Sequence, residues 1–249
     1  MDFFEVVLIL AVGLVAGAIN TLAGGGSLLS LPILIFLGLP PAVANATNRV
    51  AIFSQNIFAV AGFKSKGIAA FKYSIVLGIS ALLGAIIGAK IAVDIKGELF
   101  NKILAVIMIV VVLLTVSGKA KPNGINKEIT NLSSKWIGTT VFFFIGIYGG
   151  FIQAGVGFLI IASLSGIHRF SLVKTNSIKV FVVLIYTIAA LIVFIYEGKV
   201  NWLYGIVLAV GNSTGAWFAS RWSVDKGDKA IKIFLVVTVI ALAIKLWLF

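Results

Sequence analysis

The sequence predicts an all-α polytopic membrane protein with two inverted repeats of five membrane segments, in which the second segment of each repeat is short and follows a glycine break. Three observations support this prediction. Of the 249 residues, 61% are hydrophobic and only 11% are charged, whereas about a quarter of the residues of a soluble domain are charged. Glycine-rich breaks interrupt two apolar runs, and motifs of the first half recur in the second half in the same order.

The apolar stretches come in two groups that are separated by a polar stretch. About 20 apolar residues are needed to cross a bilayer as a helix. In chain order, the candidate membrane segments are 4–22, 27–38, 45–63, 73–93, 98–117, 136–154, 156–166, 174–196, 201–221 and 229–249. The chain therefore divides into a first membrane repeat over 1–117, a connecting cytoplasmic loop over 118–135 and a second membrane repeat over 136–249.

The two halves share motifs that include polar residues, which are rare in membrane segments. The matched pairs are GAIIGAKIAVD at 84–94 with GAWFASRWSVD at 215–225, Thr47-Asn48 with Thr175-Asn176, and AGGG at 23–26 with AGVG at 154–157. Because the matches fall in the same order in both halves, we interpret them as an internal duplication, a common plan in transporters.

The basic residues indicate how the two repeats are related. If the short segments 27–38 and 156–166 each change sides, Lys and Arg divide 14 to 6 between the two sides, but if each returns, they divide 9 to 11. The uneven division agrees with the positive-inside rule. It predicts an odd number of segments per half, hence inverted repeats, with both termini outside. Since about 12 residues do not span the hydrocarbon, each short segment either crosses with help from extended chain or forms a dipping hairpin with the preceding segment.

Several kinds of chemistry are excluded by composition. The chain has no cysteine, which excludes disulfides and thiolate sites. No cluster of His, Asp and Glu suits a metal, and the sequence has no Walker motif for using ATP. The net charge of +12 comes mostly from basic residues that flank apolar runs, so we expect the lipid bilayer rather than nucleic acid as a partner. We expect no enzyme activity, no cofactor and no metal, and a solvated loop position for His168.

The two glycine breaks are the candidate binding site for a small anion. Where a helix restarts after such a break, its free N–H groups and its dipole attract negative charge. Inverted symmetry would bring the two breaks together near the midplane, with Arg49 or Lys179 as the charge partner. The predicted substrate-binding residues are Asn20, Thr21, Gly25, Gly26, Ser27, Asn48, Arg49, Gln153, Gly155, Gly157, Asn176, Ser177 and Lys179.

Each of these features also has a purely structural explanation. Glycines allow membrane helices to pack closely, and Asn and Thr cap helices. Arg49 and Lys179 are compatible with end charges that snorkel to the interface. Arg221 and Asp225 are expected to form an i,i+4 ion pair at a segment end.

The stretch AGGGSLLSLPILIFLGLPPAVANATN at 23–48 resembles the sulfite exporter TauE/SafE family. The resemblance rests on a glycine cluster, an inner proline at Pro32, a Gly-Leu-Pro-Pro turn at 38–41 and the Ala-Thr-Asn start of the next helix. It extends over essentially the full length. The second half departs from the pattern, with Gly-Val-Gly at 155–157, Ser163 near the place of the proline, and Gly-Ile-His-Arg instead of the Pro-Pro turn.

The resemblance implies that the protein moves sulfite, organosulfonates or related sulfur-containing anions across the cytoplasmic membrane. We therefore expect a secondary transporter with a small anionic substrate. Two alternatives stay open at this point. One is an anion channel-like pore that uses the same residues, and the other is a non-transporting membrane partner or anchor subunit that docks through Ser117–Lys135.

Overall fold

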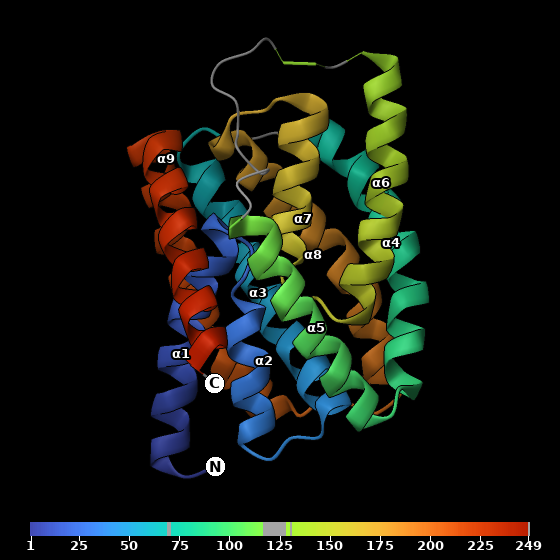
Figure 1. Cartoon of the computed structure of the whole chain (residues 1–249), viewed down its shortest axis with the longest axis vertical. Coiled ribbons are helices and arrows are strands. Elements are labelled where there is room, and N and C mark those ends of the chain that lie inside the picture. The colour runs from blue at the N-terminus through green and yellow to red at the C-terminus, as the bar shows by residue number, and fades with distance from the viewer. Residues whose placement is uncertain (69–70, 117–127, 130, 249) are drawn as a thin grey trace.

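The computed structural model describes residues 1–68, 71–116, 128–129 and 131–248, and its regular secondary structure in this part of the chain is helical. The helices lie side by side with their long axes close to vertical in Figure 1. In chain order they are α1 (Phe3–Leu22), α2 (Ser27–Phe36), α3 (Pro41–Ser65), α4 (Phe71–Asp94), α5 (Gly97–Val116), α6 (Leu132–Phe151), α7 (Val156–Ser163), the π-helix η1 (Leu164–His168), α8 (Leu172–Tyr196) and α9 (Trp202–Leu248).

Most helix ends fall within a few residues of the predicted segment ends, and two differences have local causes. Helix α6 begins four residues before the predicted 136, because Asn131 caps it by accepting a hydrogen bond from the Ser134 N–H (2.9 Å). The segments 201–221 and 229–249 follow each other within α9, and Gly227, with a φ of 70°, breaks the helix at a kink between them. Of the predicted loop over 118–135, residues 118–127 and 130 lie outside the described residues.

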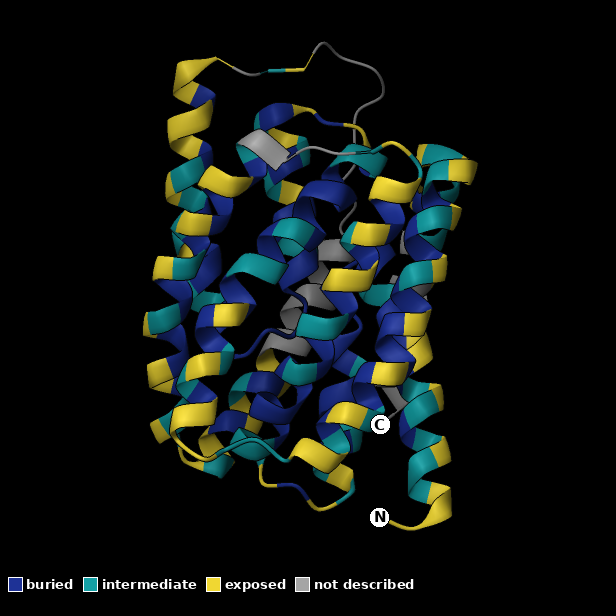
Figure 2. Cartoon of the chain, turned by 180° about the vertical axis from the view of Figure 1, so that it is seen from behind, coloured by how far each residue is buried: buried dark blue, intermediate teal, exposed yellow. Residues whose placement is uncertain are grey.

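Three of the described helices are long and apolar enough to cross a membrane. They are Phe3–Leu22, Tyr73–Asp94 and Leu172–Tyr196, with mean hydropathies of 2.2, 2.2 and 2.8. Large apolar side chains such as Phe144 and Phe218 are exposed. In Figure 2, exposed positions lie along the outer faces of the bundle. Because such a surface is unfavourable in water and suited to lipid, the chain is a helical membrane protein.

The helices of the two halves pack in matching pairs. Helix α1 lies along α9, on the left in Figure 1, and α6 lies along α4 on the right. Helix α3 packs against α9, α8 packs against α4, and α3 and α8 contact each other between these pairs. Suppose that α1 is matched with α6, α3 with α8, and α4 with the first part of α9. The α1–α9 contact then corresponds to the α6–α4 contact, and the α3–α9 contact to the α8–α4 contact.

Small residues allow the paired helices to approach closely. A Cβ atom on Gly17 of α1 would collide with the backbone of Asn212 on α9, and a Cβ atom on Gly150 of α6 would collide with the backbone of Ala85 on α4. Close approach through small residues is a common way to pack helices in membranes. Gly17 in α1 and Gly150 in α6 thus serve close packing between helices.

Each short helix returns toward the end of the molecule at which the helix before it began. Helix α2 occupies the lower part of the bundle in Figure 1, near the start of α1, and α7 occupies the upper part, near the start of α6. At the upper end, Ile129, just before α6, donates its backbone N–H to the carbonyl of His168 at the end of η1 (2.9 Å). Both pairs therefore have the geometry of a hairpin that enters the bundle and returns.

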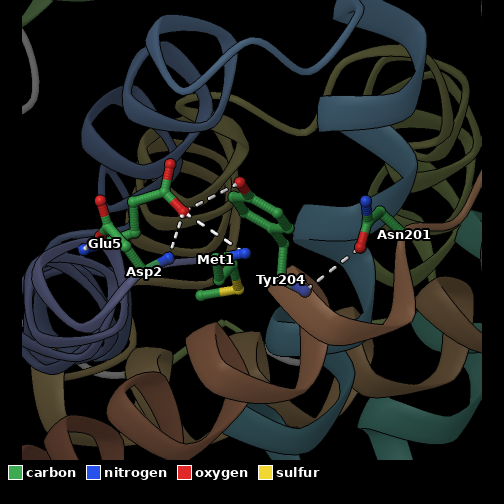
Figure 3. A network of polar contacts seen from close by, with 5 residues as sticks. All are labelled: Met1, Asp2, Glu5, Asn201 and Tyr204. Atoms are coloured by element: carbon green, nitrogen blue, oxygen red, sulfur yellow. Dashed lines mark hydrogen bonds and ion pairs between the residues drawn. The ribbon is translucent and has the colours of Figure 1, made fainter.

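At the lower end, polar contacts join the first helix to the start of α9 (Figure 3). The Glu5 carboxylate accepts hydrogen bonds from the backbone N–H of Asp2 (3.1 Å) and from the Tyr204 hydroxyl (3.4 Å), and it lies 3.7 Å from the N-terminal amino group. Asn201 accepts from the Tyr204 N–H (3.3 Å). The Glu5–Tyr204 contact therefore joins the two halves at this end of the bundle.

The expectation of a solvated His168 is wrong. Its side chain is buried and stacks on the Phe170 ring, with 5.2 Å between the ring centroids. The ring Nε2 lies 2.8 Å from the Tyr73 hydroxyl, and Nδ1 lies 3.1 Å from the Ile129 carbonyl oxygen. His168 therefore joins the chain before α6 to α4 and to the end of η1.

Candidate anion-binding site

The two glycine breaks meet in the interior of the bundle. A Cβ atom on Gly24 would collide with the Cα of Gly157, and a Cβ atom on Gly157 would collide with the Cα of Gly24. Gly24 also has a φ of 90°, which glycine adopts without the steric cost of a side chain. The breaks thus lie side by side, the arrangement expected from the symmetry of the motifs.

The first break is held by polar groups from its own helix. The Asn20 side chain accepts a hydrogen bond from the Gly26 N–H (2.8 Å), and the Thr21 hydroxyl donates to the Gly17 carbonyl (2.9 Å). In this conformation one of the predicted anion donors, the Gly26 N–H, already has a partner. An anion would therefore have to compete with Asn20 for this group.

The second break contains a strained residue. Gln153 has a φ of 66°, a left-handed conformation that costs a residue with a side chain roughly 1–2 kcal/mol. Its side-chain oxygen accepts a hydrogen bond from the Tyr186 hydroxyl (2.9 Å). Gly155, with a φ of 72°, precedes the first residue of α7. Tyr186 on α8 therefore holds the strained turn that starts α7.

A small cavity lies beside the two breaks. Its volume is about 10 Å³, which is room for roughly one water molecule. It is lined from both halves of the chain, by Asn20, Gly24, Ile52, Gln55, Asn56, Gln153, Val156, Gly157, Lys179 and Val183. Lys179 is the single charged side chain among these residues.

Three amides are joined across this region, and two of them were absent from the predicted site. The Gln55 side-chain oxygen accepts hydrogen bonds from Asn20 (3.1 Å) and from Asn212 (3.1 Å). Gln55 and Asn56 both line the cavity. Gln55 and Asn56 follow Asn48 by seven and eight residues on α3, so these three side chains lie on neighbouring parts of one helix face. This spacing is the sequence signal that points to Gln55 and Asn56.

Lys179 binds the carboxyl-terminal end of α1. Its side chain is buried, and Nζ donates to the Thr21 carbonyl (2.8 Å) and to the Asn176 side-chain oxygen (2.8 Å). Asn176 in turn donates to the Leu22 carbonyl (3.0 Å). The last carbonyls of a helix have no partner within that helix, so α8 of the second half caps α1 of the first.

Arg49 does the same for the carboxyl-terminal end of α6. Its guanidinium donates to the carbonyls of Gly149 (2.9 Å) and Gly150 (2.6 Å), and its Cζ lies 4.9 Å from the centre of the Phe194 ring. Asn45 donates to the Phe151 carbonyl (2.8 Å). Helix α3 of the first half therefore caps α6 of the second.

The two buried cations differ in their relation to the cavity. The relative exposures of Arg49 and Lys179 are 0% and 2%, so the alternative that they snorkel to the interface is wrong. Within the part of the chain that the structure describes, neither forms an ion pair with a carboxylate. Lys179 lines the cavity and Arg49 does not. Of the two candidate charge partners, Lys179 is the one that the fold brings to the breaks.

The remaining predicted residues lie around the cavity or at helix ends beside it. Asn48 accepts a hydrogen bond from the Ser30 hydroxyl (2.7 Å) and donates to the Ser27 hydroxyl (3.3 Å), so it binds the first turn of α2. Ser177 is buried on α8. Of the predicted residues, four line the cavity: Asn20, Gln153, Gly157 and Lys179. Five lie in the breaks or in the contacts that cap them: Thr21, Gly25, Gly26, Gly155 and Asn176. Three make contacts between helices: Ser27, Asn48 and Arg49.

Asp225 does not form the expected ion pair with Arg221. Asp225 binds Lys66 at the end of α3 (2.7 Å), and the Arg221 guanidinium lies 5.2 Å from the centre of the Trp217 ring. A partner from another helix is available because α3 packs along α9. Among the residues described, no three His, Cys, Asp or Glu side chains are grouped as metal ligands.

The fold and the site define a helical membrane protein with a polar, cationic centre shared by two halves. The family model for the sulfite exporter TauE/SafE matches residues 9–246, and the chain belongs to this family of membrane transporters.

Similar proteins from several bacteria are named only as probable transporters. A probable membrane transporter protein, ORF9, of Sinorhizobium sp. is 27% identical over 233 residues, which cover 93% of this chain and 88% of the relative. The probable membrane transporter protein YfcA of Escherichia coli K12 is 26% identical, with coverages of 94% and 87%. YunE of Bacillus subtilis is 22% identical, with 86% of each chain covered. No solved structure matches the chain significantly.

Proposed function

We propose that this protein is a secondary transporter that moves small sulfur-containing anions, such as sulfite or organosulfonates, across the cytoplasmic membrane. The anion binds near the midplane, between the two glycine breaks. Membership of the sulfite exporter TauE/SafE family supports this choice of substrate.

One observation supports an anion above all others: a buried lysine lines the cavity, and no described carboxylate pairs with it. A buried charge without a counter-ion is costly. A small anion beside Lys179 removes that cost, and the amides of Asn20 and Gln153 provide hydrogen-bond donors for its oxygens. The site therefore favours a negatively charged substrate over a neutral one or a cation.

The transport mechanism in this proposal is alternating access. The cavity has room for roughly one water molecule, so an anion enters only when the two breaks move apart. Transporters with inverted repeats commonly achieve this by moving one repeat against the other. A cavity this small favours a carrier over the alternative of an open pore. A cavity that is lined by Lys179 and shared by both halves favours transport over a subunit that only anchors a partner.

The proposed membrane topology consists of two inverted five-segment repeats, 1–117 and 136–249, joined by a cytoplasmic loop over 118–135. The matching packing pairs of the two halves support the duplication. The hairpins α1–α2 and α6–α7 begin from opposite ends of the bundle (Figure 1), as inverted repeats require. The uneven division of Lys and Arg between the two sides, 14 to 6 in the sequence, supports a cytoplasmic upper end with both termini outside.

The proposal is tested by uptake of radiolabelled sulfite into liposomes that contain the purified protein. Sulfoacetate, taurine, sulfate and acetate serve as competitors. We expect saturable uptake that is stimulated by internal unlabelled sulfite, and stronger inhibition by sulfoacetate than by acetate. Lys179→Met should lose most of the uptake, whereas Lys174→Met, on the same helix and partly exposed, should retain it.

Three results would contradict the proposal in different ways. Uptake that neither saturates nor responds to counterflow indicates a pore. Equal inhibition by acetate and sulfoacetate shows that the site does not select sulfur-containing anions. If the wild-type protein takes up none of these anions while the protein remains monodisperse, the transport function itself is wrong.

A further inference from the structure

The amino group of Lys179 has a geometry that suits both of its protonation states. Its Nζ donates to two acceptors, the Thr21 carbonyl and the Asn176 side chain. An ammonium group has three N–H bonds, and a neutral amine has two N–H bonds and a lone pair. Both forms can therefore keep the two observed hydrogen bonds. They differ only in the third position, which is an N–H bond in one form and a lone pair in the other.

The surroundings of Lys179 make its charge depend on what the cavity holds. The cavity lining contributes amides, glycines and apolar side chains in addition to Lys179 itself. Without an anion, the ammonium has only the uncharged oxygens of Thr21 and Asn176 as partners in the described contacts, and burial disfavours such a charge. With an anion in the cavity, the charged form gains a counter-ion and is favoured.

Other titratable groups on the packed helices have partners elsewhere. Arg49 on α3 binds the carbonyls at the end of α6, Tyr186 on α8 binds Gln153, and Tyr148 on α6 donates to the Ala154 carbonyl. His168 of η1 binds Tyr73, and α7 carries no ionisable side chain. Glu5 lies in the first turn of α1, Asp94 is the last residue of α4, and the Arg221 guanidinium lies beside the Trp217 ring in α9.

We propose that Lys179 carries the proton that drives transport, so that one proton and one negative charge move together in the same direction. This inference rests on the proposed transport function and names its coupling ion. On one side, a proton from water forms a bond with the Nζ lone pair as the anion enters. On the other side, the anion leaves, that N–H bond breaks, the proton passes to water, and the neutral amine returns.

The test uses methanesulfonate, because a sulfonate stays ionised and does not carry a proton itself. Wild-type protein is placed in liposomes that contain a trapped pH-sensitive dye, with the outside about one pH unit more acidic than the inside. Electroneutral symport of one proton with one anion should concentrate radiolabelled methanesulfonate about tenfold inside, since one pH unit is a tenfold ratio in proton activity. The dye should report acidification that requires methanesulfonate.

Lys179→Arg tests whether this residue is the carrier. A guanidinium keeps its charge but does not release a proton in a protein. We expect the variant to lose both accumulation driven by the pH gradient and acidification driven by the anion. Lys174→Arg, the same change at a partly exposed position of α8, should keep both.

Exchange of methanesulfonate at equal pH on both sides separates the two proposals. If wild-type protein exchanges the anion but moves no protons with it, proton coupling is overturned and the transport function stands. If Lys179→Arg still couples the two fluxes, Lys179 is not the carrier. If wild-type protein neither exchanges nor accumulates methanesulfonate, sulfite or sulfoacetate, the proposed function fails together with this inference.

Discussion

Gly24 and Gly157, 133 positions apart in the sequence, are in such close contact that a methyl group on either would collide with the Cα of the other. This contact joins the two glycine breaks, and the cavity lined by Lys179 lies beside it. The size of the site is therefore set by how closely two backbones approach.

The first prediction concerns this contact. Gly157→Ala should destabilise the protein by about 1–3 kcal/mol, because overpacking a tight contact displaces its surroundings. It should also lower the initial rate of sulfite uptake roughly tenfold, since about 1.4 kcal/mol is a factor of ten. Thermal unfolding in detergent and liposome uptake measure the two effects. Gly166→Ala is the control, because a Cβ atom there meets nothing within 4 Å; equal behaviour of the two variants would contradict the assignment.

The second prediction concerns the clamp between Arg49 and α6. Arg49→Lys keeps the charge but loses the fork that reaches the carbonyls of Gly149 and Gly150. We expect a loss of about 1–3 kcal/mol in stability, as for a buried polar group left without its partner. Because Arg49 does not line the cavity, the order in which competitor anions inhibit should stay the same. A changed order would place Arg49 in contact with the substrate. Arg221→Lys is the control for stability.

The third prediction concerns the strained turn at Gln153. Tyr186→Phe removes the hydroxyl that donates to the Gln153 side chain (2.9 Å) and leaves the ring in place. Loss of about 1 kcal/mol of hydrogen bonding should loosen the start of α7 and raise the KM for sulfite roughly fivefold. Tyr196→Phe, at an exposed position of the same helix, should leave KM unchanged. An unaltered KM in Tyr186→Phe would mean that this hydrogen bond does not position the site.

The fourth prediction concerns the start of α8. The Asp228 carboxylate accepts hydrogen bonds from the backbone N–H groups of Leu172 and Val173 (2.9 Å each), so a residue beyond the Gly227 kink caps this helix. Asp228→Ala should lower stability by about 0.5–2 kcal/mol, the usual cost of losing a cap. Asp228→Asn, which keeps one acceptor oxygen, should lose less. Glu98→Ala, which removes an exposed pair with Lys102, should cost at most about 1 kcal/mol.

The positions of the helices could be predicted from the sequence because apolar length is a local property. Lipid leaves a buried chain few options besides a helix, so each apolar run became a helix within a few residues of the predicted bounds. The glycine breaks were equally visible, since Gly24 to Gly26 interrupt an apolar run and the sequence 154–157 repeats the pattern. The likeness of the two halves also indicated that the breaks would face each other.

The partners of individual polar residues could not be predicted from the sequence. His168 follows a short apolar segment and was expected in solvent, but Tyr73, 95 residues earlier, covers it. Asp225 was assigned to Arg221, four residues earlier on its helix, and binds Lys66, 159 residues away. Periodicity describes the neighbours of a residue within its own helix, whereas these contacts depend on which helices pack together.

The sequence by itself determined the class of the protein, its helices and the two breaks, whereas the burial of Arg49 and Lys179 came from the structure. Only the tertiary structure decided that Arg49 and Lys179 have different positions relative to the site, although both cap a helix of the opposite half. The physical reason is that the last carbonyls of α1 and α6 need donors from outside their own helices. Helix packing determines which cation meets those carbonyls beside the cavity and which meets them away from it.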